Sequence, residues 1–413
     1  MLGRLLLLLS LLLPLPVMAQ TMNGDWNGTL VIPSGGQLRF LFQFRDTPAG
    51  LSVTPVQVDL RSAAFPPGIA TRSGKNFTIV FPALNGSYQG VLSDDGKSIS
   101  GSWTQRGQSL PLNLAPGAIT AAVLHQPEPG DVAVATPTGT LAGTILTAGD
   151  GKLAAVIITG AGPANRDGNS PVNGMRGTYR DIAEGLAAQG VTTLRFDKRG
   201  IGQSASAMPH ESELRIQTSG DDVRALAAEL KKRTGASCVW LVGHSEGALI
   251  AKLAADGNKD ICGLVSVAGV GHGMDIGWRE AMARGLPPDQ KQRANAVLDS
   301  LVAGRTVPDV PPMMMGAFRP NIQPYMISVL AQDPAAALRR LKVPVLILQG
   351  DADTNVPPEN AKALAAVRPD ATLKIMLGVN HSLRLAKDDN GTGPGPLAPG
   401  LTETIAEFMK AHR

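Results

Sequence analysis

Two patterns of hydrophobic and polar residues divide the chain near residue 116. From about residue 21 to 116, apolar and polar positions alternate in short runs, and turn sequences such as Ser93 to Lys97 separate the runs. Alternation with a period of two is typical of strands that bury one face. The expected strands are 28–32, 38–44, 51–60, 77–81, 88–92, 99–105 and 110–114.

This first part, residues 20–116, is therefore predicted to be a small antiparallel β-domain. Trp26, Trp103 and repeated glycines suggest a lipocalin-like barrel or sandwich that closes through its terminal strands. The connection from 115 to 131 contains three prolines and is the natural domain boundary.

Residues 117–413 show short, apolar, β-branched runs that alternate with helical patterns. This alternation indicates βαβ units and a doubly wound, mainly parallel sheet, so the expected fold class is α/β. A helical cap is expected over about 270–341, where the alternation is interrupted. The expected strands are 153–160, 191–197, 238–243, 261–269, 343–350 and 372–378, and the expected helices between them are 179–189, 219–233, 248–255 and 358–367.

Residues 1–19 have the features of a signal peptide. Arg4 gives a positive start, residues 5–17 form an apolar run that is short and broken by prolines, and small residues precede a cleavage site near Ala19. The residue after that site is Gln20 and not a cysteine, which argues against a lipoprotein anchor. We therefore expect a periplasmic or secreted protein without stable membrane insertion.

Gly243-His244-Ser245-Glu246-Gly247 stands between an apolar strand and a helical segment. A sharp strand-to-helix turn exposes its central hydroxyl, and the flanking glycines remove Cβ atoms that would clash. Ser245 is therefore the predicted nucleophile. The helix that follows would favour negative charge beside it.

A serine nucleophile needs a base and an acid. His381 is the candidate base among six histidines, because it lies in a loop after the last predicted strand, at the sheet edge where the elbow opens. His244 is set aside because its side chain should point away from that of Ser245. Asp351 and Asp353, which follow the strand 343–350, compete as the acid.

The oxyanion that forms during acyl transfer needs backbone N–H donors. The elbow supplies the amide of Glu246. The loop after strand 153–160 supplies a second donor, for which Ala161 is preferred and Gly162 is the alternative.

Together these motifs resemble the α/β-hydrolase superfamily, in its branch of bacterial exported serine esterases and serine aminopeptidase-like enzymes. The resemblance runs from about Gln126 to the C-terminus and includes Thr159 to Pro163, Leu194 to Ser204, the elbow and His381. In that superfamily the acid falls three residues after the glycine that ends its strand, which implies Asp353. Many relatives carry His-Gly at the oxyanion loop, where this chain has Ala161.

The predicted activity is hydrolysis of a small-molecule ester or acyl substrate of short to medium chain length, with Ser245, His381 and Asp353 as the triad. Serine aminopeptidase, with the cap residue Glu280 as a weak candidate for binding an ammonium group, and thioesterase or acyltransferase are alternatives on the same triad. A non-catalytic binding protein is a remote alternative. Cap residues Met314, Phe318 and Tyr325, together with Gly162, are candidates for substrate binding.

Composition narrows the partners further. The net charge of +4 is spread without basic runs, so we expect no nucleic-acid binding. The loop after residue 197 lacks the spacing of a dinucleotide-binding motif, and no Cys/His pattern indicates a metal, so no cofactor is expected. The two cysteines, Cys238 and Cys262, open successive strands that should be neighbours, and we expect a disulfide between them.

Overall fold

The computed structural model describes most of the chain beyond residue 21. The predicted signal peptide lies outside the described residues, as do residues 118–127 of the expected domain connection, so the predicted boundary stays a prediction. The described residues are 22–31, 37–47, 50–57, 68–81, 86–105, 107–117, 128–170, 174–208, 210–311, 314–389 and 395–412.

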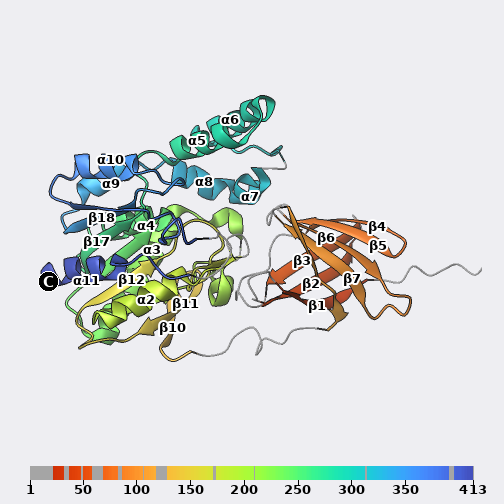
Figure 1. Ribbon diagram of the computed structural model, residues 1–413, viewed down its shortest axis with the longest axis horizontal. Helices are drawn as coiled ribbons and strands as arrows, with labels where there is room; N and C mark the ends of the chain where they lie inside the picture. Colours follow the sequence, from red (N-terminus) through yellow and green to blue (C-terminus); the bar gives the residue numbers. More distant parts are fainter. Residues whose placement is uncertain are drawn as a thin grey trace, which may run out of the picture.

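The first part of the chain forms one antiparallel sheet, which confirms the predicted β fold (Figure 1). Along each strand, large apolar side chains such as Phe42, Phe44 and Trp103 are buried in a shared core while alternate residues face outward. The strands are β1 (Gly24–Val31), β2 (Gln37–Thr47), β3 (Gly50–Gln57), β4 (Gly68–Ser73), β5 (Asn76–Phe81), β6 (Gly86–Leu92), β7 (Ile99–Gln105), β8 (Gln108–Pro111) and β9 (Ala115–Pro116).

This sheet is curled, and its first and last strands meet. Leu114 bridges to Ile99 in β7, and two residues later β9 pairs with β1 through Trp26 and Pro116. The segment from β8 to β9 thus joins both edges of the sheet. A single curled sheet excludes the sandwich alternative. The strand β4 was not expected, because its sequence has little apolar alternation.

The second sheet is mixed and mainly parallel, as predicted, in the order β10-β11-β15-β12-β16-β17-β18-β19. The antiparallel hairpin β10–β11 at one edge is the part that sequence analysis missed. Its strands are β10 (Asp131–Thr136), β11 (Gly139–Leu146), β12 (Ala154–Ile158), β15 (Thr192–Phe196), β16 (Val239–His244), β17 (Ile261–Val267), β18 (Val345–Gly350) and β19 (Thr372–Met376), beside a two-stranded sheet of β13 (Asn169–Ser170) and β14 (Gly174–Met175).

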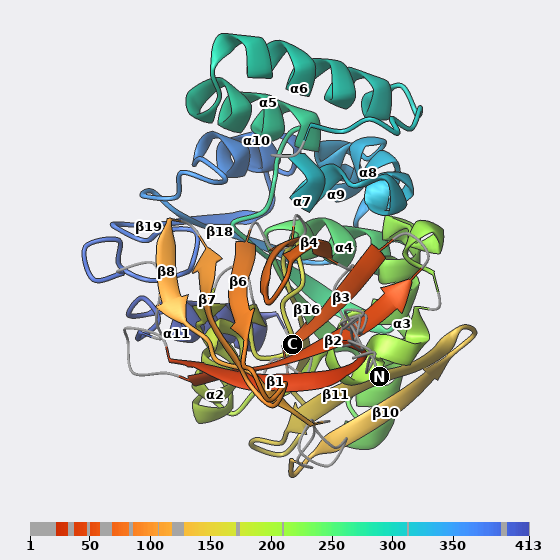
Figure 2. The same ribbon diagram turned by 90° about the vertical axis from the view of Figure 1, so that its right-hand side faces the viewer.

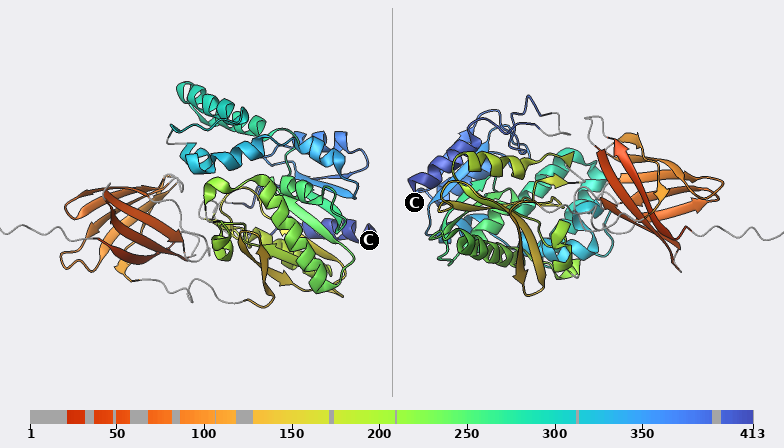
Figure 3. Two further views of the ribbon diagram at one scale, coloured as in Figure 1. Left: turned by 180° about the vertical axis from the view of Figure 1, so that it is seen from behind. Right: turned by 90° about the horizontal axis from the view of Figure 1, so that it is seen from below.

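Helices cover both faces of the second sheet. One core packs α3 (Ile216–Thr234), α4 (Glu246–Ala255) and α10 (Glu359–Val367) against alternate strand residues. The other packs α2 (Thr178–Ala188) and the C-terminal α11 (Leu401–Ala411) against the remaining ones. Strands covered on both faces bury every side chain, which explains their continuous apolar runs. Figure 3 shows this layered lobe beside the curled sheet.

The expected cap region, between β17 and β18, is helical. Figure 2 shows α5 and α6 as its outermost pair, with α7, α8 and α9 nearer to α4. The cap helices are α5 (Met274–Gly285), α6 (Pro288–Val302), α7 (Met315–Phe318), α8 (Gln323–Leu330) and α9 (Pro334–Arg340), with the short 3-10 helix η6 (Pro320–Ile322) before α8. Two further 3-10 helices, η3 (Gly202–Ala207) and η4 (Glu211–Glu213), lie between β15 and α3.

A disulfide joins Cys238 and Cys262, which confirms the expectation drawn from their strand positions. Their Cα atoms lie 5.2 Å apart because β16 and β17 are parallel neighbours. The bridge therefore ties the strand that carries Ser245 to the next strand, across a separation of 24 residues.

Removal of this bridge by Cys238→Ala with Cys262→Ala should lower the free energy of unfolding by about 3 kcal/mol, since the cross-link restricts the unfolded chain. Urea denaturation of both proteins measures the difference. Thiol titration of the denatured, unreduced wild type should find no free thiol. Two thiols per chain would contradict the bridge.

Candidate active site

Ser245 occupies a strained corner between β16 and α4. Its φ of 55° and ψ of −121° lie where residues with a side chain rarely occur. A Cβ atom at Gly243 would stand 2.3 Å from the carbonyl oxygen of Gly247, and one at Gly247 would stand 2.3 Å from that of Ile158. Both positions therefore require glycine, as expected from the motif. The Ser245 amide donates to the carbonyl of Val267 at 2.9 Å, which fixes the corner to β17.

The loop after β12 lies directly against this corner. A Cβ atom at Gly160 would be 3.2 Å from the Cβ of Ser245. Ala161 and Gly162, which follow, are exposed, and Gly162 has a φ of 89°. Within the described part of the chain, the amides of Ala161 and Glu246 donate to no protein acceptor. Two N–H groups beside the serine are therefore available to a bound oxygen.

His381 and Asp353 form a hydrogen-bonded pair. The Nδ1 atom of His381 lies 2.8 Å from Oδ2 of Asp353, whose side chain is completely buried. The other carboxylate oxygen accepts the amides of Asn355 and Val356, each at 2.9 Å. Burial alone would raise the pKa of Asp353, but the bonds from His381 and these amides outweigh it and hold the pKa below its ordinary value. The carboxylate is therefore charged and accepts the Nδ1 proton.

The competing acid, Asp351, has another role. Its carboxylate accepts the amide of Gly378 at 2.6 Å, and the residue is exposed. It thus closes the turn after β19 and makes no contact with His381. The amide of Ala352 donates to the carbonyl of Val379 at 3.1 Å, which holds the loops of Asp353 and His381 side by side.

A chain of hydrogen bonds connects the oxyanion loop, the elbow and the loop of His381. The Gly160 amide donates to the Tyr179 hydroxyl at 2.8 Å, the hydroxyl is 2.9 Å from Nδ1 of His244, and Nε2 of His244 is 3.0 Å from the carbonyl oxygen of His381. A carbonyl can only accept, so Nε2 carries the proton and Nδ1 accepts from Tyr179. Burial, and then the charge of His381, lower the pKa of His244 to about 3, so its ring is neutral.

Sequence reasoning set His244 aside and did not single out Tyr179. The elbow motif assigns a role to its serine and glycines, but no local pattern shows that a helix 65 residues earlier supplies a hydroxyl to the histidine. His244 and His381 have their ring centroids 4.9 Å apart. His244 therefore supports the backbone of the candidate base.

One candidate binding residue of the cap reaches the elbow, and two do not. The hydroxyl of Tyr325 in α8 donates to the buried carboxylate of Glu246 at 2.8 Å. Met314 and Phe318 are buried in the hydrophobic interior of the cap, where Phe318 packs on Trp278. Glu280, the weak candidate for an acidic subsite, is exposed on α5.

The loop after β15 is held by buried ion pairs. Asp197 accepts the backbone amide and the guanidinium of Arg166, both at 2.8 Å. Arg199 pairs with Asp222 of α3. These ion pairs compensate the buried charges of Asp197, Arg166 and Arg199 within the protein.

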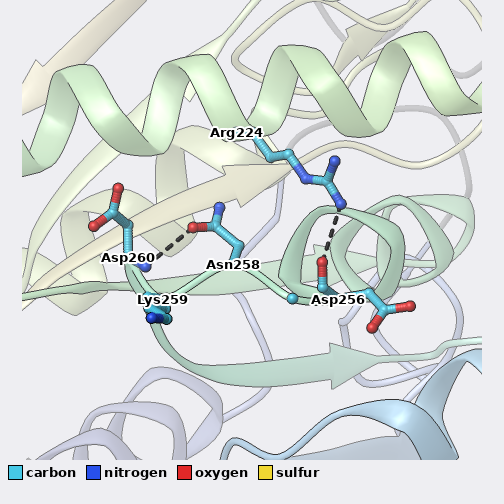
Figure 4. A pocket seen from close by; sticks show the side chains of 6 residues that line it. Arg224, Asp256, Asn258, Lys259 and Asp260 are labelled. Atoms are coloured by element: carbon cyan, nitrogen blue, oxygen red, sulfur yellow. Dashed lines mark hydrogen bonds between the residues drawn. The ribbon is translucent and has the colours of Figure 1, made fainter.

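A surface pocket shown in Figure 4 lies away from these residues. It is formed where α4 ends and β17 begins, at the edge of the sheet opposite to Ser245. Arg224 there donates to the carbonyls of Ala254, Leu253 and Asp256 and so caps the end of α4. The pocket is lined by Arg224, Asp256, Gly257, Asn258, Lys259 and Asp260.

The described residues form neither a metal-binding cluster nor a membrane-spanning helix. They contain no group of three or more His, Cys, Asp or Glu residues placed to hold a metal ion. None of the helices they form has the length and apolar character needed to cross a bilayer.

The mixed sheet with a serine elbow after its fifth strand in spatial order defines an α/β-hydrolase fold. Residues 172–388, just over half of the chain, match the model of the family described as serine aminopeptidase, S33. The chain belongs to this family.

Individual relatives are distant. Esterase EstD of Thermotoga maritima is 27% identical over 207 residues, which are 49% of this chain and 47% of that protein. The chain thus spans about half the length of that relative. Among solved structures, Est1E from Butyrivibrio proteoclasticus and proline iminopeptidase from Mycobacterium smegmatis are each 18% identical, with a TM-score of 0.47, and each match covers 68% of this chain and 98% of the other.

The neutral, buried His244 predicts a defined acid sensitivity. Its pKa of about 3 in the folded protein lies below its ordinary value of 6.5, so the unfolded state binds more protons between these values. The stabilising contribution is complete above pH 6.5 and is lost as the pH falls towards 3. His244→Gln should therefore reduce the dependence of unfolding free energy on pH between about 6 and 4.5, by roughly 1.4 kcal/mol per pH unit at most.

Urea denaturation at several pH values measures this slope. His210→Gln, which replaces an exposed histidine, is the matched control and should leave the slope unchanged. An unaltered slope in His244→Gln would show that His244 is not held neutral.

Proposed function

We propose that this protein is a serine hydrolase that cleaves carboxylic esters with short- to medium-chain acyl groups. The observation that carries the proposal is the hydrogen bond between buried Asp353 and half-buried His381, beside an elbow that holds Ser245 in a strained, partly exposed position. An acid, a base and a serine at the carboxyl edge of one sheet are the parts that acyl transfer needs.

In the proposed mechanism, Nε2 of His381 removes the proton of Ser245 while Oγ attacks the ester carbonyl carbon. The resulting oxyanion accepts the N–H groups of Ala161 and Glu246. When the tetrahedral intermediate collapses, the ester C–O bond breaks and His381 gives its proton to the departing alcohol. His381 then deprotonates a water molecule, which attacks the acyl-enzyme and releases the carboxylic acid. Asp353 stabilises the imidazolium throughout.

Ester hydrolysis is favoured over release of N-terminal residues by the charges near the serine. An aminopeptidase needs an acidic group that faces the substrate's ammonium. Glu246 is the acidic residue next to Ser245, but its carboxylate is buried and accepts a hydrogen bond from Tyr325. Glu280 is exposed on the outer cap helix α5. The Thermotoga maritima relative, which is named as an esterase, supports the same choice.

We also propose that the protein works in the periplasm or outside the cell after removal of residues 1–19. The disulfide between Cys238 and Cys262 supports this location, because such bonds persist in oxidising compartments.

Substitutions at the triad should separate its members by size of effect. Ser245→Ala or His381→Ala should reduce ester turnover by several orders of magnitude, and Asp353→Asn by about ten-thousand-fold, because the wrong histidine tautomer is then favoured. Asp351→Asn is the matched control and should have a small effect, since Asp351 bonds to Gly378 and not to His381. The measurement is kcat/KM on a p-nitrophenyl ester, with folding checked by circular dichroism. A folded Asp351→Asn that loses more activity than Asp353→Asn would refute the assignment of the acid.

A substrate panel tests the reaction class. The wild type should hydrolyse p-nitrophenyl acetate, butyrate and hexanoate at least a hundred-fold faster, by kcat/KM, than aminoacyl-naphthylamides. A fluorophosphonate probe should label the wild type and spare Ser245→Ala. Faster turnover of the aminoacyl substrates would replace the ester assignment by an aminopeptidase, and absence of labelling would remove the hydrolase proposal.

A further inference from the structure

A lysine side chain holds the peptide group that precedes the predicted oxyanion donor. Lys198 follows β15, and its Nζ donates to the carbonyl oxygen of Gly160 at 2.6 Å. This contact arises because β12 and β15 are parallel neighbours, so the loops after them open at the same edge of the sheet. Sequence analysis assigned Lys198 no role.

The bonded carbonyl and the predicted donor belong to one peptide group. The C=O of Gly160 and the N–H of Ala161 share a plane, and in a trans peptide they point in opposite directions. The described residues contain no cis peptide bond. A side chain that fixes the direction of this C=O therefore fixes the direction of the Ala161 N–H as well.

Position 160 needs such an anchor because it is a glycine, at a place with little room for a Cβ atom. A Cβ atom there would be 3.2 Å from the Cβ of Ser245 and 3.4 Å from the carbonyl oxygen of His244. Glycine has the greatest backbone freedom of any residue. The Tyr179 hydroxyl holds the peptide group on the N-terminal side of Gly160, and Lys198 holds the one on its C-terminal side.

We propose that Lys198 is a positioning residue for the oxyanion hole, which orients the Gly160–Ala161 peptide and polarises its N–H through the charge on its carbonyl. This inference rests on the proposed hydrolase function. Lys198 itself touches no reacting atom, and it acts through Ala161.

The ammonium of Lys198 is only weakly screened by solvent. The residue is half-buried, so its field acts through a medium of lower polarity than water. Burial lowers the pKa of Lys198 below its ordinary value, and the nearby carboxylate of Glu246 opposes this shift only in part. A positive charge on the carbonyl side draws electron density from the amide, which makes its N–H a stronger donor to a developing oxyanion.

The test compares Lys198→Met with Lys152→Met. Lys152 also donates to a glycine carbonyl, that of Gly235 at 3.1 Å, but it precedes β12 and lies at the opposite edge of the sheet. Both variants therefore remove a hydrogen bond from a lysine to a glycine carbonyl. Lys198→Met removes it beside Ser245, and Lys152→Met removes it far from Ser245. Three quantities are measured for each protein: turnover of p-nitrophenyl butyrate, inhibition by butylboronic acid, and inhibition by butyramide. The boronic acid forms a tetrahedral, negatively charged adduct that places an oxygen in the oxyanion hole. Butyramide stays planar and neutral, so it does not imitate the oxyanion.

Lys198→Met should lower kcat/KM and the affinity for the boronic acid by about 10- to 100-fold, somewhat less than complete loss of an oxyanion donor costs. The affinity for butyramide should change by less than about two-fold, because ground-state binding does not use the polarised N–H. Lys152→Met should match the wild type in all three. Rates are divided by the concentration of sites titrated with a fluorophosphonate, so partial misfolding does not imitate the effect.

Lys198→Gln, which keeps a donor but removes the charge, is made in parallel. It should lower kcat/KM and the affinity for the boronic acid several-fold. Equal boronic acid affinity in wild type and both Lys198 variants would overturn the inference. Equal loss for the boronic acid and the amide would also overturn it, because Lys198 would then bind substrate or only support the fold. If the wild type reacts with the fluorophosphonate but hydrolyses no ester, the ester assignment fails alone. In that case the rates of phosphonylation of the variants decide the role of Lys198.

Discussion

The close approach of β12, β16 and α4 at Ser245 is the constraint on which the rest of the site depends. There is no space for a Cβ atom at residue 243 or 247, and the serine between them adopts a backbone conformation that few residues tolerate. The strained conformation persists because the elements around it are closely packed and because the Ser245 amide donates a hydrogen bond to β17. The same closeness leaves little room for a Cβ atom at position 160, where the glycine is a flexible point in the proposed oxyanion loop.

Hydrogen bonds of fixed direction make up for that flexible point. Tyr179 and Lys198 hold the two peptide groups of Gly160, and His244 carries the connection onward to the backbone of His381. Each member has a defined donor and acceptor role, because the chain ends on a carbonyl that can only accept. A buried network in which every group has its partner is rigid, whereas a partly satisfied one would cost stability. The loops that carry the proposed oxyanion donor and the proposed base are thus aligned through one neutral imidazole.

The cap contributes to the site through one contact that is visible in the described residues. Tyr325 reaches down from α8 to the carboxylate of Glu246, the residue after the nucleophile. The same carboxylate lies near Lys198 and opposes the lowering of that residue's pKa by burial. Met314 and Phe318 stabilise the cap itself by filling its interior. The curled N-terminal sheet has a separate core of large aromatic residues and supplies none of the groups described at the elbow.

The sequence by itself determined the layered sheet, the antiparallel β-domain and the elbow, because each follows from periodicity or from a local motif. It left the β-domain open between a barrel and a sandwich, and it favoured a bond between Cys238 and Cys262 because the two residues open neighbouring strands. The sequence narrowed the candidate acid to Asp351 or Asp353, and the family resemblance favoured Asp353. The tertiary structure decided which of the two contacts His381. Both aspartates follow the same strand, and only the fold of the loop turns the carboxylate of Asp353 inward. The strand β4 escaped detection because its sequence has little apolar alternation, and the hairpin β10–β11 lies outside the βαβ alternation from which the sheet was predicted. His244, Tyr179 and Lys198 gained their roles only in three dimensions. Their partners lie on other strands and helices, and a hydrogen bond between distant segments leaves no trace in the local pattern of a chain.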